Sequence, residues 1–163
     1  PANVTQGPPG QQMSKTNVPF KDSPLVGGTG GMPFRVVSPD GEPAVGVRYR
    51  LGQWQGQDAV AKIEGVFQRD KELGPWEYVF AREGYALGAI QVDGDEFVFA
   101  VRLAFMRIDG KRLDAKNSYV SEWIGSPSGK EPKTLNGNGA PVIGFHGRAM
   151  AIVDAVGLVF AEE

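Results

Sequence analysis

One carboxylate near the C-terminus of the sequence stands in an unusual setting for an acid. Asp154 is the only acidic residue between Glu131 and Glu162, and its neighbours are apolar. A carboxylate in such surroundings needs hydrogen-bond partners, either backbone N–H groups of its own loop or a polar ligand. Asp154 is therefore the first candidate for a binding residue, and a purely structural role is the alternative.

Catalytic patterns are missing from the rest of the chain. Residues 125–129 read GSPSG and carry Pro127 where a nucleophilic serine would stand, and the glycine-rich residues 27–31 are not followed by the Gly-Lys-Ser/Thr of a phosphate-binding loop. The chain has no Cys and one His, His146, which excludes thiol catalysis, zinc–thiolate sites and multi-imidazole zinc sites. We expect no enzyme, no cofactor and no metal.

An acidic cluster around Gly94 is the one hint of a cation site. Asp93, Asp95 and Glu96 lie together, but the twelve-residue calcium-loop pattern is missing. The cluster is more typical of a hairpin turn.

Composition limits the class of partner. The 163 residues carry 17 Lys and Arg against 19 Asp and Glu, a formal net charge of −2, so the sequence lacks the clustered positive charge that nucleic-acid binding requires. No apolar run approaches the roughly 18–20 residues of a membrane span. We expect neither a nucleic-acid partner nor membrane insertion.

The chain divides into a leader and one domain. Residues 1–24 are rich in Pro and Gln and have one aromatic residue, which predicts an extended leader or linker that could also lie along the domain surface. Residues 25–163 form the predicted domain. With no Met at its start, the sequence is expected to be a processed product or a fragment.

The domain reads as short strands separated by turns. Alternating or β-branched apolar stretches occur at residues 45–51, 76–81, 96–105, 142–145 and 153–160, with Gly- and Asn-rich turns between them. Residues 59–73 could be partly helical, and residues 118–124 could form a helical turn. The spacing of strands and turns favours an all-β sandwich, barrel or prism.

The C-terminal segment resembles the signature of the jacalin-related lectins. Residues 144–148 read GFHGR and residues 154–157 read DAVG, with the separation found in that family, and the glycine loop at residues 27–31 is similar to the family's first loop. The resemblance spans about residues 25–160. It implies an all-β β-prism of three four-stranded Greek-key sheets with pseudo-threefold symmetry.

The resemblance also implies a carbohydrate site where the two loops meet. Carried over by position, Asp154 would accept sugar hydroxyls, and the backbone N–H groups of Gly31, Ala151 and Ile152 would donate to the same ring. The chain continues uninterrupted before Gly27, as in the mannose/glucose-type members. One departure is Met150, which stands where the family usually has Gly, at a position that could need a positive φ.

Two functional readings follow, and both stay open at this point. The first is a lectin-like module that binds mannose/glucose-type glycans, works through oligomers or repeated domains, and is secreted to the extracellular space or cell surface. The alternative is a non-catalytic structural or protein-interaction module in which Met150 has closed the sugar site.

Of the three tryptophans, Trp54, Trp76 and Trp123, we expect Trp54 to be the most exposed, because Gly52 and Gly56 flank it.

Overall fold

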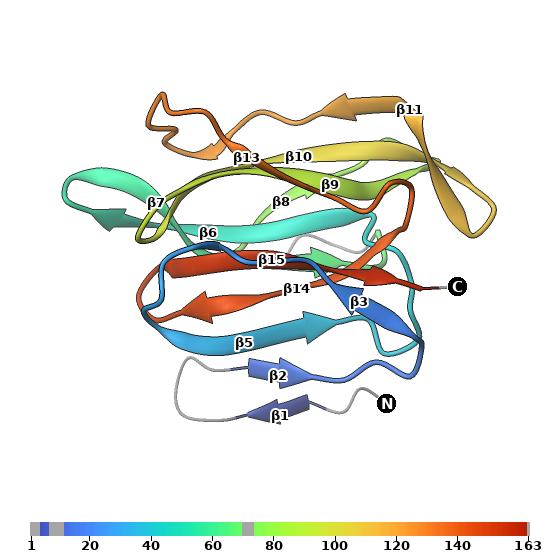
Figure 1. Cartoon of the computed structure of the whole chain (residues 1–163), viewed down its shortest axis with the longest axis horizontal. Helices are drawn as coiled ribbons and strands as arrows, with labels where there is room; N and C mark the ends of the chain where they lie inside the picture. The colour runs from blue at the N-terminus through green and yellow to red at the C-terminus, as the bar shows by residue number, and fades with distance from the viewer. Residues whose placement is uncertain (1–3, 7–11, 70–73, 163) are drawn as a thin grey trace.

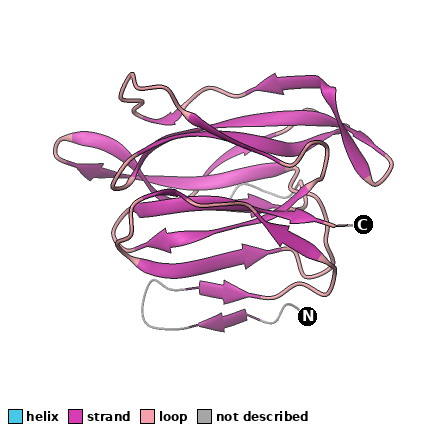
Figure 2. Ribbon diagram, viewed as in Figure 1, coloured by secondary structure: helices cyan, strands magenta, loops and turns pink. Residues whose placement is uncertain are grey.

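The chain folds from β-strands joined by turns. The computed structural model describes residues 4–6, 12–69 and 74–162, and these residues contain strands and no helix (Figures 1 and 2). The all-β prediction is therefore confirmed. It also follows that the described residues hold no helix long and apolar enough to cross a membrane.

The strands form three sheets, as the β-prism prediction requires. Within the described residues the sheets contain seven, five and three strands rather than four each. The first sheet is larger because segments that precede residue 25 add strands to both of its edges. In the middle of this sheet, the hairpin formed by the last two strands of the chain lies between strands from the N-terminal part.

The first sheet has the order β1-β2-β5-β14-β15-β3, and β4 also pairs with β15. Among the strands that the structure describes in this sheet, only β2 and β5 pair in parallel. Its strands are β1 (Val4–Gln6), β2 (Gln12–Ser14), β3 (Phe20–Asp22), β4 (Val26–Gly27), β5 (Met32–Val37), β14 (Val142–Ala149) and β15 (Val153–Ala161).

The other two sheets complete the prism. The second sheet has the order β7-β6-β8, and the third has the order β11-β10-β9-β13 with β12 also paired to β10. Their strands are β6 (Gly46–Trp54), β7 (Gln57–Val66), β8 (Glu77–Phe80), β9 (Tyr85–Gly94), β10 (Val98–Asp109), β11 (Arg112–Val120), β12 (Ile124–Gly125) and β13 (Lys133–Asn136).

Alternate residues of the longest strands build one shared core between the three sheets. Phe145 comes from the first sheet, Val60 from the second, and Leu103 and Phe105 from the third, and each is at most 1% exposed. These four side chains come from strands whose alternate residues point to the interior.

Both helical expectations are wrong. Residues 57–66 form β7, which pairs with β6 along its whole length and buries Val60 and Ile63 in the core. Pairing of the full strand outweighs the weak helical periodicity there. Residues 118–120 end β11 and Ile124 begins β12, and residues 70–73 lie outside the described part of the chain.

The described part of the leader runs along the first sheet. β2 pairs with β5 at Met13 and Arg35, and β3 pairs with β15. Arg35 also donates from Nη1 and Nη2 to the two carboxylate oxygens of Asp22, at 2.9 and 2.5 Å, and this hydrogen bonding holds the pKa of Asp22 below its usual value. The boundary at residue 24 stays a prediction, since these strands join leader and domain in one sheet.

His146 belongs to the same arrangement. Its Nε2 lies 3.1 Å from the carbonyl oxygen of Ser23, and burial lowers the pKa of the imidazole. A neutral ring that donates from Nε2 ties the leader to β14, which is a structural role.

The glycines of the C-terminal motif allow strands to approach closely. A Cβ at Gly147 would overlap the carbonyl oxygen of Ala155 across the hairpin, and one at Gly144 would overlap the carbonyl oxygen of Val36 on β5. A Cβ at Gly157 would lie 2.7 Å from Nε2 of His146. The motif therefore sets the packing of the strands that carry the loop before Asp154.

Gly147→Ala is expected to destabilise the fold. The added methyl must push β15 away from β14, which costs about 2–3 kcal/mol of unfolding free energy, or a fall in Tm of roughly 5–10 °C. Thermal unfolding followed by circular dichroism measures this. The control is Gly74→Ala, where a Cβ meets no atom of the described residues within 4 Å, and the account is contradicted if the two variants lose the same stability.

Candidate functional site

The glycine loop and the loop before Asp154 meet at one end of the prism, on the left in Figure 1. Ala155 pairs with Gly27, and the N–H of Gly28 donates to the carbonyl oxygen of Asp154 at 2.9 Å. On the other side of the loop, Ala149 pairs with Met32 at the start of β5. The strands thus fix both ends of each loop.

Two glycines make room for the carboxylate of Asp154. A Cβ at Gly30 would lie 2.7 Å from Oδ2, and a Cβ at Gly31 would lie 2.6 Å from Oδ1. Gly31 also has a φ of +76°, which L side chains rarely adopt. Both carboxylate oxygens therefore face glycine backbone, and the structure brings Gly31 and Asp154 together as the family resemblance implies.

Arg148 holds the glycine loop in place. Its Nε donates to the carbonyl oxygen of Gly30 at 3.0 Å, and its Nη2 donates to that of Gly31 at 2.8 Å. Arg148 therefore bridges the carbonyl groups of two successive loop residues. The guanidinium links β14 to the turn before β5 and adds positive charge beside Asp154.

The carboxylate of Asp154 has acceptor capacity to spare. It is partly exposed, and it forms no hydrogen bond or ion pair with the described residues. Burial raises the pKa of Asp154, and the charge of Arg148 opposes that rise. An ionised carboxylate in this position can accept two hydroxyl groups from one ligand.

Three backbone N–H groups of the two loops lack a protein acceptor. In the described part of the chain, the N–H groups of Gly31, Ala151 and Ile152 make no hydrogen bond to a protein acceptor. The loop is closed instead by the N–H of Met150, which donates to the carbonyl oxygen of Ile152 at 3.0 Å. Ala151 is exposed, and the side chain of Ile152 is anchored in the interior.

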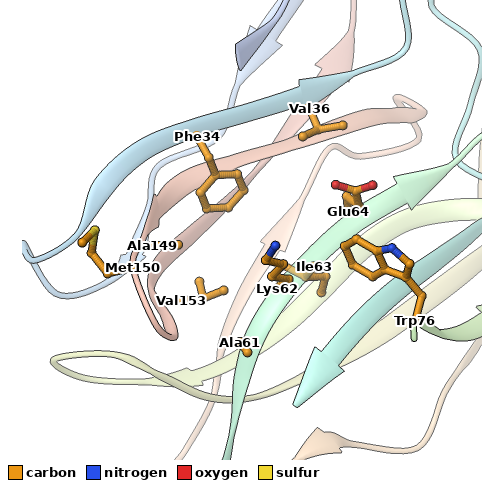
Figure 3. A pocket seen from close by; sticks show the side chains of 10 residues that line it. All are labelled: Phe34, Val36, Ala61, Lys62, Ile63, Glu64, Trp76, Ala149, Met150 and Val153. Carbon is orange, nitrogen blue, oxygen red and sulfur yellow. The ribbon is translucent and has the colours of Figure 1, made fainter. Parts of the chain in front are cut away.

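Met150 fits its position without a left-handed backbone. The non-glycine residues with positive φ among those described are Gln55 and Asn138. Met150 is 60% exposed and borders a groove of about 510 Å³, open mouth included, with Phe34 of β5 and Ile63 of β7 on its walls (Figure 3). Neither Asp154 nor Gly31 lines that groove.

Two more hairpins border the same end of the prism. A Cβ at Gly52 of β6 would lie 3.5 Å from Cγ2 of Ile152, so the β6–β7 hairpin adjoins the loop. A Cβ at Gly28 would overlap the carbonyl oxygen of Glu96, so the β9–β10 hairpin adjoins the glycine loop. Sequence reasoning missed both neighbours, because their closeness arises only from the packing of the sheets.

The remaining candidates lie elsewhere or have structural partners. Asp93 is 4% exposed and accepts hydrogen bonds from the N–H and the hydroxyl of Ser128. The described residues contain no group of three or more His, Cys, Asp or Glu side chains arranged to hold a metal ion. Trp76 and Trp123 each stack with an arginine, Arg48 and Arg102, at 4.3 and 4.7 Å between guanidinium carbon and ring centroid.

Similarity to known proteins defines the class of this fold. The structure is similar to a wild-type banana lectin (TM-score 0.60, 14% identity, covering 89% of this chain and all of that one). It is also similar to a mannose-specific jacalin-related lectin from Morus nigra solved with mannose (TM-score 0.57, 16% identity, covering 91% and 99%). The fold is that of a β-prism lectin, as predicted.

The sequence points to the same family. Over 115 residues the chain is 27% identical to Jacalin-related lectin 33 of Arabidopsis thaliana, a match that covers 66% of this chain and 38% of that protein. The chain thus spans well under half the length of this relative. No family model matches the chain. The predicted resemblance to the jacalin-related lectins is confirmed by this sequence match together with the fold.

Asp154→Asn is expected to stabilise the protein at neutral pH. A folded-state pKa above the unfolded value means that the protonated carboxyl contributes stability below about pH 3.8 and that this contribution is lost as pH rises through the folded pKa. The neutral amide removes that loss, so the variant should have a higher Tm than wild type at pH 7. Differential scanning calorimetry at pH 3 and pH 7 measures it.

The two pH values separate charge from shape. At pH 3 the wild-type carboxyl is largely protonated, so the two proteins should melt within about 1 °C of each other. A variant that melts lower than wild type at pH 7 would contradict the view that the Asp154 carboxylate lacks sufficient partners in the free protein.

Proposed function

We propose that the protein is a carbohydrate-binding module of mannose/glucose type that binds its sugar at Asp154. The observation that carries the proposal is the carboxylate itself, which faces Gly30 and Gly31 and has no hydrogen-bond partner among the described residues. A group that is partly desolvated and left without partners in the free protein gains most from a ligand that supplies donors.

Sugar hydroxyls suit this site chemically. Two neighbouring hydroxyls on one ring can donate to the two oxygens of Asp154, while the N–H groups of Ala151, Ile152 and Gly31 donate to ring and hydroxyl oxygens. The glycines leave the backbone open to close approach. The Morus nigra lectin with a similar fold is described as mannose-specific, which supports mannose as the first sugar to test.

Two observations, on Met150 and on the leader strands, favour the carbohydrate-binding module over the alternative of a protein-interaction module. Met150 has no positive φ, and its exposed side chain borders a groove that neither Asp154 nor Gly31 lines. The described leader strands β2 and β3 pair with β5 and β15 of their own chain. That pairing leaves those edges covered and unavailable to another protein.

The expected setting follows from the weakness of single-sugar binding. A site of this size gives roughly millimolar affinity, or about −4 kcal/mol, so useful binding depends on several sites acting together. We propose oligomers or neighbouring domains as the source of that multivalency. We propose an extracellular or cell-surface location, where glycans are displayed, and no catalytic activity.

Asp154→Ala is expected to abolish sugar binding. Loss of two charge-assisted hydrogen bonds costs about 1.5–3 kcal/mol each, which takes a millimolar site beyond measurable affinity. Isothermal titration with methyl α-mannoside and methyl α-glucoside tests this directly, and a glycan array extends the test to other sugars.

Asp95→Ala is the matched control. Asp95 is an exposed acid of the β9–β10 hairpin, at the same end of the prism, and it forms a 3.8 Å ion pair with Lys130. This variant should bind like wild type. Sugar binding that persists in Asp154→Ala would move the site elsewhere, and wild-type protein that binds no glycan on the array would favour the interaction module.

A further inference from the structure

Trp54 stands at the tip of the β6–β7 hairpin with much of its ring in solvent. It is 44% exposed, and it pairs with Gln57 across a two-residue turn. Both turn residues, Gln55 and Gly56, have positive φ, at 52° and 81°, which is the pattern of a tight type I′ hairpin. A tip built this way holds the indole at a defined place rather than on a long loop.

A second hairpin braces the indole. The ring of Phe97, in the β9–β10 hairpin, meets Trp54 edge-on with centroids 5.4 Å apart and an interplanar angle of 62°. Phe97 in turn contacts Phe99, with centroids 4.4 Å apart. The row of three rings fixes the orientation of Trp54 while leaving nearly half of its surface open.

Both hairpins adjoin the two loops of the Asp154 site. Gly52 lies against Ile152 and, with a Cβ, would be 3.9 Å from the carbonyl oxygen of Ala151. Trp54 is two residues further along the same face of β6, about 7 Å beyond Gly52. Phe97 directly follows Glu96, whose carbonyl oxygen lies against Gly28 of the glycine loop. The indole therefore borders the end of the prism that holds Asp154.

We propose that Trp54 is a second sugar subsite, which stacks on the apolar face of a sugar ring linked to the one held at Asp154. The inference rests on the proposed function and deepens it, because it makes the ligand an oligosaccharide of at least two rings. An exposed, braced aromatic ring next to a polar site supplies apolar contact that Asp154 and the backbone donors lack. Stacking needs no specific hydroxyl, so Trp54 contributes affinity for chain length rather than for one sugar.

The test compares a short and a long ligand on the full chain. Methyl α-mannoside and a linear mannotriose are titrated into wild type, Trp54→Ala, Trp54→Phe and Asp154→Ala by isothermal calorimetry. Trp123→Ala is the matched control, because Trp123 stacks on Arg102 in the third sheet. Circular dichroism and Tm show that each variant is folded.

The expected pattern separates the two subsites. Trp54→Ala should leave monosaccharide affinity unchanged within about twofold and weaken mannotriose binding about tenfold, with Trp54→Phe in between and Trp123→Ala like wild type. Asp154→Ala should lose both ligands. Mannotriose, and not the monosaccharide, should also protect wild-type tryptophan fluorescence from acrylamide quenching.

Two results overturn the inference. If wild type binds both ligands but Trp54→Ala binds mannotriose as tightly as wild type does, the Trp54 subsite is wrong and the Asp154 site stands. If wild type binds neither ligand, the proposed function fails in its mannose form and the Trp54 inference fails with it.

Discussion

The close approach of the glycine loop to Asp154 is the constraint on which the rest of the site depends. Gly30 and Gly31 lie so near the carboxylate that any side chain at either position would collide with it. Arg148 keeps the loop there by binding both glycine carbonyls. The Asp154 carboxylate is therefore held in a narrow space between glycine backbone groups, and it has no hydrogen-bond partner among the described residues.

The fold supplies that confinement from segments far apart in the chain. β4 and β5 lie on opposite sides of the β14–β15 hairpin, so the loop between them must cross the end of the first sheet, just where Asp154 stands. Gly147 and Gly144 let the strands beneath approach closely enough for this crossing. The same end of the prism also receives the β6–β7 and β9–β10 hairpins, which extend the surface around the site (Figure 1).

The sequence predicts the class of fold and singles out Asp154 as the candidate site residue, and it fails where the packing of the sheets decides the structure. Asp154 stands out because an acid among apolar neighbours is a local signal, and the glycine runs are local signals too. The sequence does not show that residues 59–66 form a strand, because their apolar spacing is partly helical. Their pairing with β6 in the folded sheet makes them a strand. The contact of Trp54 with Phe97 is equally hidden, because it joins two hairpins whose separation no spacing rule gives. The sequence suggested that Met150 stands at a position that needs a positive φ, but its φ is not positive. The φ of a loop residue depends on how the loop is closed, which the sequence does not reveal.

The central claim is that a sugar takes up the unused donors and acceptor of this one loop junction. The most direct measurement is a titration of ¹⁵N-labelled protein with methyl α-mannoside, followed by amide chemical shifts. The account predicts that the largest shifts occur at the N–H groups of Gly31, Ala151 and Ile152, which have no protein acceptor among the described residues. Shifts centred on another part of the prism, or none at saturating sugar, would contradict it.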